Sequence, residues 1–222
     1  MPRVLSLITI GPQYEFVVAR EGGPTLFSER YRADRQPLSK YVDHLLERIL
    51  PHFSEGSDPE RYVAVCPGPG SLTGIRIGIA IAQAVCRASG ARLYSVNLGQ
   101  ALRALRVPGA GADSVIALDG RNGAFGFAPL STGEFKFVLY QNCAQSVKRE
   151  TQFLGYGDDL VKLENLLGPF TNRITLDALS LAEAMAEVLF QARNSLQLES
   201  LRYAGPAYGL EALTGGKPPK VE

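Results

Sequence analysis

Short stretches rich in hydrophobic residues open this chain, and apolar residues then recur at helical spacing. These stretches predict three successive strands over residues 4–10, 14–20 and 25–32, joined by short turns rich in glycine and proline. Apolar residues three and four positions apart then predict a helix over 38–50, which Pro51 should stop. The N-terminal part is therefore predicted to be a β-meander followed by a helix.

The rest of the chain repeats a rhythm of strands and helices. The predicted strands are 62–66, 92–96, 114–118, 124–128 and 134–140, and the predicted helices are 73–87, 98–105 and one that begins after Ser180. The small, turn-rich segment 107–112 predicts a boundary between two lobes, 1–106 and 107–222. This order of elements predicts an α/β protein with mixed sheets in two lobes.

The helix predicted over 73–87 also has a strand-like feature, because isoleucines occupy every second position from 75 to 81. Glycine and alanine lie between them, and both are poor strand formers, so the helix is favoured. On that helix Gly74, Gly78 and Ala82 align one turn apart as a flat strip. A helix that is apolar around most of its circumference must be buried on two sides. We therefore expect one side to face its own sheet and the other side to face another chain.

Composition narrows the classes of function. The 222 residues are 45% hydrophobic and 20% charged with a net charge of +1, which is ordinary for a soluble globular protein. Without a basic excess, tight binding of nucleic acid by this chain alone is not expected. Three widely spaced cysteines indicate reduced thiols. No apolar run reaches the roughly 20 residues of a membrane span, and no signal-peptide pattern opens the chain, so we expect a cytoplasmic protein.

The stretch Cys66–Gly78, which reads CPGPGSLTGIRIG, connects a predicted strand to a predicted helix. A glycine loop in this place can bring backbone N–H groups close to a phosphate or to a second chain. The dinucleotide fingerprint does not fit, because Gly68, Gly70 and Gly74 have one residue too many in the second gap. The loop has no lysine for a Walker motif, and the flanks of Ser71 do not match a hydrolase elbow.

Residues Gly68–Gly78 instead closely resemble the GPGSFTGLRIG signature of the TsaB (YeaZ) family, with Leu72 for Phe and Ile75 for Leu. Segments 118–121 and 205–208 are similar to two further family segments. The resemblance implies the actin/Hsp70-like (ASKHA, RNase H-like) two-lobed fold. It also implies a non-catalytic dimerisation subunit, which partners a TsaD-like catalytic subunit. With a TsaE-like ATPase, that pair attaches threonylcarbamoyl to the adenosine beside the anticodon of tRNA.

The resemblance also implies where the partner binds, namely on the helices near 38–50 and 73–87. The expected partner-binding residues are Leu38, Val42, Leu45, Gly70, Ser71, Thr73, Gly74, Arg76, Gly78 and Ala82. We expect contact with tRNA only through the complex and no contact with a membrane. The sequence leaves open whether the chain also forms a homodimer. No cofactor is predicted within the chain, and a nucleotide at the partner interface is left open.

The chain departs from the family where actin-like ATPases hold a metal. The family's first strand usually ends in Asp-Thr-Ser, but Ile8 stands in the place of the acid. An apolar side chain cannot coordinate Mg²⁺, which argues against independent ATP hydrolysis. The first alternative function is nevertheless an actin-like ATPase that acts alone. The second is an M22-type glycoprotease-like peptidase.

Other candidate residues are weighed against ordinary structural roles. Asp119 and Arg121 follow a predicted strand and could orient a ligand, but a structural ion pair in a turn is equally consistent with them. Ser71 is better placed to cap a helix than to act as a nucleophile. His44 and His52 do not have the spacing of a metal motif. We therefore predict no catalytic residue and no metal ligand.

Overall fold

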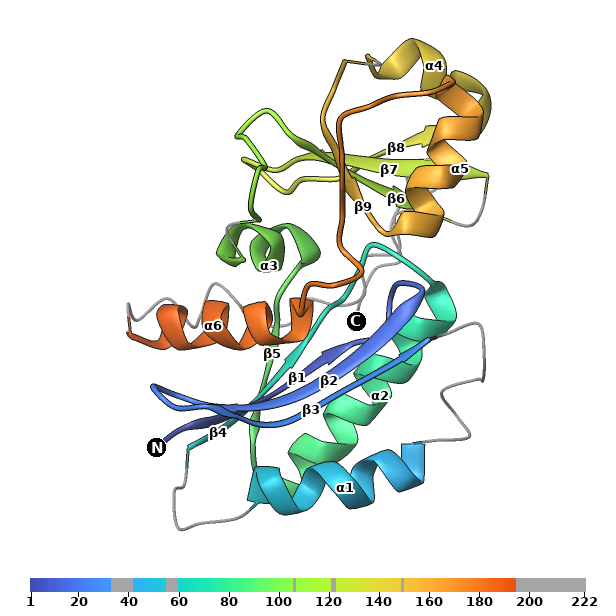
Figure 1. The fold of residues 1–222 in the computed structure, drawn as a ribbon. Helices are drawn as coiled ribbons and strands as arrows, with labels where there is room; N and C mark the ends of the chain where they lie inside the picture. Colours follow the sequence, from blue (N-terminus) through green and yellow to red (C-terminus); the bar gives the residue numbers. More distant parts are fainter. Residues whose placement is uncertain (33–41, 55–59, 106, 121–122, 149, 195–222) are drawn as a thin grey trace, which may run out of the picture.

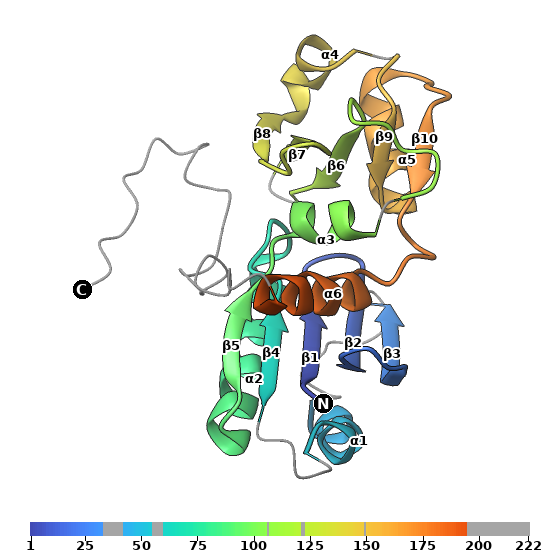
Figure 2. The ribbon, with the colours of Figure 1, turned by 90° about the vertical axis from the view of Figure 1, so that its left-hand side faces the viewer.

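The structure is a computed structural model of the whole chain, which is built around two β-sheets (Figure 1). It describes residues 1–32, 42–54, 60–105, 107–120, 123–148 and 150–194. Each sheet has five strands and carries helices of its own, and helices α3 and α6 lie between the two sheets (Figure 2). The predicted α/β class with mixed sheets is confirmed. Within the described ranges, no helix is both long enough and apolar enough to span a membrane.

The first sheet has the strand order β3-β2-β1-β4-β5. Its strands are β1 (Arg3–Ile8), β2 (Gln13–Arg20), β3 (Thr25–Arg32), β4 (Arg61–Val65) and β5 (Arg92–Ser95). The first three form the predicted antiparallel meander, while β4 and β5 extend the sheet in parallel from β1. The apolar runs in the sequence predicted these strands to within two residues, and the centres of β1 and β2 are buried on both faces of the sheet.

Alternating side chains of β1 divide the core into two layers. Leu5 and Leu7 pack beneath α1 (Val42–Ser54) and α2 (Leu72–Ser89). Val4 and Ile8 point to the opposite face, where α6 (Leu181–Asn194) covers the sheet and α3 (Leu98–Ala104) packs against α6. The helix predicted over 73–87 is therefore confirmed as α2, and its isoleucines are shared between the two core layers, with Ile75 in one and Ile81 in the other.

The prediction that Pro51 stops the first helix is wrong, because α1 continues to Ser54. Its buried residues Leu45, Ile49 and Phe53 are spaced four apart, so Phe53 holds the last turn against the sheet. Pro51 lies on the exposed side of that turn. The packing of Phe53 outweighs the single N–H that proline removes. The first residues of the predicted helix, 38–41, lie outside the described part of the chain.

The second sheet has the order β10-β9-β6-β7-β8 and is also mixed. Its strands are β6 (Val115–Asp119), β7 (Ala124–Pro129), β8 (Lys136–Leu139), β9 (Phe153–Gly155) and β10 (Arg173–Thr175). Its helices are the 3₁₀ turn Tyr140–Asn142, α4 (Cys143–Ser146) and α5 (Gly157–Leu167). The sequence predicted β6, β7 and β8, whereas strands of three residues are too short to show a period.

The connection between the sheets is held by a buried carboxylate. Glu15 of β2 accepts a hydrogen bond from the backbone N–H of Ala182 at 3.1 Å, at the start of α6, and forms an ion pair with Arg30 at 3.7 Å. Burial raises the pKa of Glu15 despite these partners. Arg30 also donates to the carbonyls of Asp177 and Leu179. The division at 106/107 stays a prediction, and α6 packs on the first sheet although it follows the second.

Candidate functional site

The glycine motif forms the junction between β4 and α2. Ser71 precedes the first turn of α2, and its hydroxyl accepts a hydrogen bond from the N–H of Gly74 at 3.3 Å. The N–H of Ser71 itself donates to the carbonyl of Ile10 at 3.0 Å. The interpretation of Ser71 as a helix cap is therefore confirmed. The second bond ties the loop to the segment that follows β1.

The glycines of α2 face that same segment. A Cβ atom at Gly74 would lie 1.8 Å from the carbonyl oxygen of Thr9, and one at Gly78 would lie 2.2 Å from the Thr9 hydroxyl. This short separation allows the hydroxyl of Thr9 to donate a hydrogen bond to the carbonyl of Gly74 at 2.7 Å. At Gly70 a Cβ would lie 2.4 Å from the carbonyl of Ile10. The glycines are thus required for close packing within the chain.

The strip of Gly74, Gly78 and Ala82, which we predicted to receive a partner helix, is filled from within the chain in this structure, and its role in partner binding stays a prediction. All three are buried, and the two glycines face Thr9 of the same chain. Leu45, a further predicted contact, is also buried in the core beneath α1. Helical spacing identified a closely packed face, but spacing alone does not say which segment fills it.

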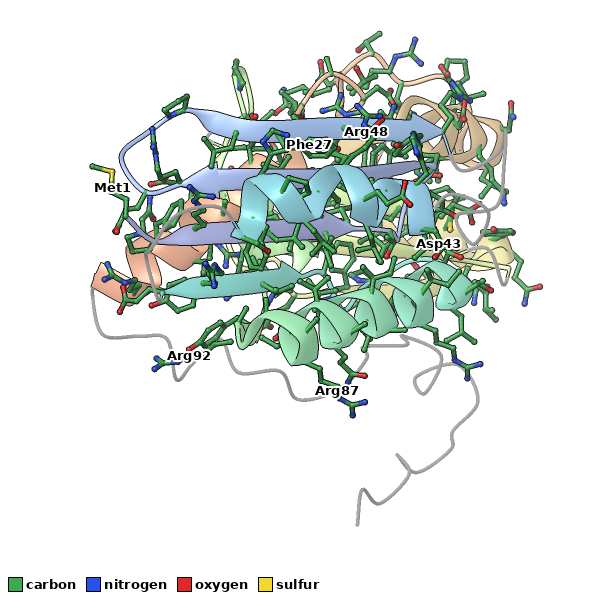
Figure 3. All side chains as sticks on the ribbon, turned by 90° about the horizontal axis from the view of Figure 1, so that it is seen from below. Met1, Phe27, Asp43, Arg48, Arg87 and Arg92 are labelled. Carbon is green, nitrogen blue, oxygen red and sulfur yellow. The ribbon has the colours of Figure 1, made fainter. Side chains whose placement is uncertain are left out.

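The opposite side of α2 is exposed. Thr73 and Arg76, both predicted contacts, lie on this side, while Val42 on α1 and the loop residues Gly70 and Ser71 are half buried. Leu38 lies outside the described residues. We define the outer face of α2 by its exposed residues Thr73, Arg76, Ala80, Gln83, Ala84, Arg87 and Ala88. Figure 3 shows Arg87 pointing away from the sheet on this face.

Sequence reasoning missed a second line of small residues on the outer face. Ala80, Ala84 and Ala88 are exposed and lie one turn apart. The same spacing rule that found the inner strip could have found this one. The choice between the two strips depends on Thr9, whose contact with α2 is a tertiary feature.

A cavity lies where the motif meets the second sheet. It is lined by Ile10, Gly11, Pro12, Pro69, Gly70, Leu118, Asp119, Tyr156 and Asp159. The ring of Tyr156 fills the space above Gly11, because a Cβ there would lie 2.6 Å from the ring. Tyr156 is 1% exposed, and burial together with nearby carboxylates raises its pKa well above the ordinary value. Its hydroxyl therefore stays neutral.

Asp119 is held at the rim of this cavity by two side chains. Its carboxylate accepts hydrogen bonds from the Tyr140 hydroxyl and from Lys162, the latter at 2.7 Å. Lys162 also lies over the ring of Tyr140, 4.5 Å from its centroid. Burial and Asp119 raise the pKa of Tyr140, so its hydroxyl stays protonated and donates to the carboxylate. Asp119 thus makes an ion pair with Lys162. Its predicted role toward a ligand stays a prediction. Arg121 lies outside the described residues.

The residues of this cavity do not fit the phosphates of a nucleotide. None of the described residues that line it is basic, and two of them are carboxylates. The N–H of Ser71 is already bonded to Ile10, and buried Ile8 ends the strand where a metal-binding acid would be needed. Among the described residues, no group of three or more His, Cys, Asp or Glu side chains is placed to hold a metal ion.

Comparison with known proteins gives one family and one fold. The family model described as "TsaD: tRNA N6-adenosine threonylcarbamoyltransferase" matches residues 37–154, more than half of the chain. No curated protein matches the sequence.

Two solved structures cover 94% of the chain. The first, "an uncharacterized protein with similarity to peptidase YEAZ from Pseudomonas aeruginosa", is 23% identical with a TM-score of 0.59 over 99% of its own length. The second, "YeaZ from Pseudomonas aeruginosa", is 22% identical with a TM-score of 0.61 over 100% of its length. The chain belongs to the TsaD tRNA N6-adenosine threonylcarbamoyltransferase family, and its fold is the actin-like (ASKHA) fold of the YeaZ (TsaB) proteins.

Proposed function

We propose that this protein is a non-catalytic dimerisation subunit of a threonylcarbamoyl-transferring complex. It binds a TsaD-like catalytic subunit, works with a TsaE-like ATPase, and reaches the adenosine beside the anticodon of tRNA only through that complex. The family match supports the reaction class. The observation that carries the dimerisation role is the division of α2 into a closed inner face and an exposed outer face.

The outer face of α2 suits a helical partner. Its alanines allow another helix to approach closely, since the distance between packed helices depends on side-chain size at the contact. Helices α1 and α2 cover the same face of the first sheet and present their outer sides together (Figure 3). Half-buried Leu46 and Leu50 on α1 add apolar surface beside them. The proposed partner surface is therefore the outer face of α2 with the neighbouring side of α1.

The charges on this surface restrict the kind of partner that fits it. The sequence of α2 contains no acidic residue, and its outer face carries Arg76 and Arg87. Exposed Asp43 and Glu47 lie on α1. A partner with acidic groups over α2 and basic groups over α1 would match this arrangement. A second copy of the chain could meet it only with α1 of one copy opposite α2 of the other.

The nucleophiles of the chain support a role without catalysis. Burial raises the pKa of Cys66 to about 12 and that of Cys86 to about 11, so neither forms a thiolate readily. Ser71 serves as a helix cap. His52 is an exposed residue of α1, and its ring packs against the ring of Phe27. The peptidase and the independent ATPase therefore have less support from these residues than the dimerisation subunit.

Co-purification with the TsaD-like subunit of the same organism tests this function. We expect the wild type to be retained, and we expect Ala84→Trp to lose retention because the indole fills the outer face. Ala144→Trp is the matched control, since Ala144 is also an exposed alanine and lies on α4, in the second sheet's layer. Retention of Ala84→Trp would show that the interface is elsewhere. Mg²⁺-dependent ATP hydrolysis by the pure protein, lost in Asp119→Asn, would instead favour the independent ATPase.

A nucleotide at the shared interface is a separate part of the proposal. The cavity beside Tyr156 does not fit phosphates, so such a nucleotide would need groups from the partner. Binding of ATP to the assembled pair but not to this chain alone would support it.

A further inference from the structure

Figure 2 shows α3 beneath the second sheet, and a groove opens beside the last turn of this helix. Its lining comes from α3, from the segment that follows α3 and from the turn between β7 and β8, and it includes Leu102, Arg103, Val107, Ala110, Leu130 and Ser131. The groove has a volume of about 270 Å³, close to the lower end of the range for ligand pockets. The cavity beside Tyr156 has about 10 Å³, which is space for one water molecule. The groove is therefore the better candidate for holding a small organic molecule.

The walls of the groove are fixed to one another. On one side α3 packs directly against the β7–β8 turn, because a Cβ at Gly99 would lie 2.4 Å from the Cα of Gly133. On the other side, buried Ser114 joins two segments: its carbonyl accepts from the N–H of Leu130 at 2.8 Å, and its hydroxyl accepts from the N–H of Gly111 at 2.9 Å. A ligand would therefore enter a largely preformed site, which reduces the cost of ordering the protein around it.

Arg103 provides the charge of this groove. It is the only charged residue among the described residues of the lining, and none of them is acidic. Its guanidinium lies against Gly133, where a Cβ would be 2.6 Å from Nη1. Within the described part of the chain, the guanidinium has no hydrogen-bond or ion-pair partner. An uncompensated positive charge with available N–H donors therefore lies at the edge of an apolar groove.

We propose that this groove binds a small carboxylate with a short aliphatic or aromatic body. The guanidinium of Arg103 binds the carboxylate, since its planar fork presents two parallel N–H donors to the two oxygens. The hydroxyl of Ser131 can donate a further hydrogen bond. The apolar side chains of the lining remove the body of the ligand from water. A phosphate fits less well, because the described lining offers a single cation and is otherwise mostly apolar.

This site goes beyond the proposed dimerisation role. The outer face of α2 covers one side of the first sheet, whereas α3 packs against α6 on the opposite side. Loss of the carboxylate site and loss of partner binding are therefore separate outcomes.

The test compares four probes that separate charge from apolar surface. Shifts of backbone N–H signals in NMR spectra are followed while hexanoate, acetate, hexan-1-ol or inorganic phosphate is added at constant pH and ionic strength. We expect saturable shifts with hexanoate, centred on the segment after α3 and on the β7–β8 turn. Acetate lacks most of the apolar body and hexan-1-ol lacks the charge, so each should bind at least about tenfold more weakly. Phosphate binding as tight as that of hexanoate, or no saturable shift with hexanoate, would overturn the proposal.

Two variants of Arg103 and one control locate the site. Arg103→Gln should weaken hexanoate binding at least about tenfold, because the charged donors are lost. Arg103→Lys keeps the charge without the planar fork and should weaken it less, by about threefold. Arg92→Gln is the matched control, since Arg92 is an exposed arginine on β5 outside the groove lining (Figure 3). Equal affinity for hexanoate in the wild type, Arg103→Gln and Arg92→Gln would overturn the assignment.

Discussion

The inner and outer faces of α2 carry similar residues and serve different ends. Each has small side chains one turn apart, Gly74, Gly78 and Ala82 inside and Ala80, Ala84 and Ala88 outside. Thr9 closes the inner face through a hydrogen bond to Gly74 and close contact with Gly78. The outer face remains exposed. A strip of small residues therefore indicates close packing, but only the fold decides whether the packed segment comes from the same chain or from a partner.

The largest expected effect is that of Gly74→Ala on stability. The new Cβ would lie 1.8 Å from a backbone oxygen, which cannot rotate away as a side chain can. We expect the free energy of unfolding to fall by about 3 kcal/mol or more, measured by urea denaturation. A loss below about 0.5 kcal/mol, the range of ordinary surface changes, would contradict the close contact between Gly74 and the backbone of Thr9.

Gly78→Ala should cost less and should be partly rescued. Its Cβ would meet the Thr9 hydroxyl, a side-chain atom that Thr9→Ala removes. We expect a loss of about 2 kcal/mol for Gly78→Ala and about 1 kcal/mol for Thr9→Ala, which also loses its hydrogen bond to Gly74. The double variant should be more stable than the sum predicts by at least about 1 kcal/mol. Strict additivity would mean that the two residues are not in contact.

Ser71→Ala tests the cap at the start of α2. The change removes the hydroxyl that accepts from the Gly74 N–H, and we expect a loss of about 1 kcal/mol in thermal unfolding. Thr73→Ala is the control on the outer face, where Thr73 is exposed. Its expected effect is within about 0.5 kcal/mol. An equal loss in both variants would refute the assignment of Ser71 as the cap.

The smallest expected effect on stability distinguishes the two faces at neighbouring positions. Ala84→Leu lies on the exposed face and should change the unfolding free energy by no more than about 0.5 kcal/mol. Ala82→Leu adds the same atoms to a buried position and should cost about 1–3 kcal/mol. Similar values for the two variants would contradict the orientation of α2.

Much of the fold was predictable from the sequence because local patterns determine it. The strands up to Arg32 are apolar stretches bounded by turn residues, and the glycine motif stands between a strand and a helix. The end of α1 was missed because Phe53 is held by tertiary packing beyond Pro51. The short strands β9 and β10 carry too few residues for any period.

The candidate site was less predictable, because its contacts join distant segments. The motif was found from its spacing, but its neighbour Thr9 lies 65 residues before Gly74. Nothing near Tyr156 in the sequence indicates that its ring would fill the space above Gly11. Asp119 was identified at the end of a strand, whereas its partners Tyr140 and Lys162 come together only in the folded chain.

The most direct test of the two-faced helix is a comparison of affinities for the TsaD-like subunit. The measurement uses the wild type, Ala84→Trp on the outer face, and the rescued inner pair Thr9→Ala with Gly78→Ala. Our account predicts that the inner pair binds within about threefold of the wild type, while Ala84→Trp weakens binding at least about tenfold. Wild-type binding by Ala84→Trp together with loss of binding by the folded inner pair would contradict it.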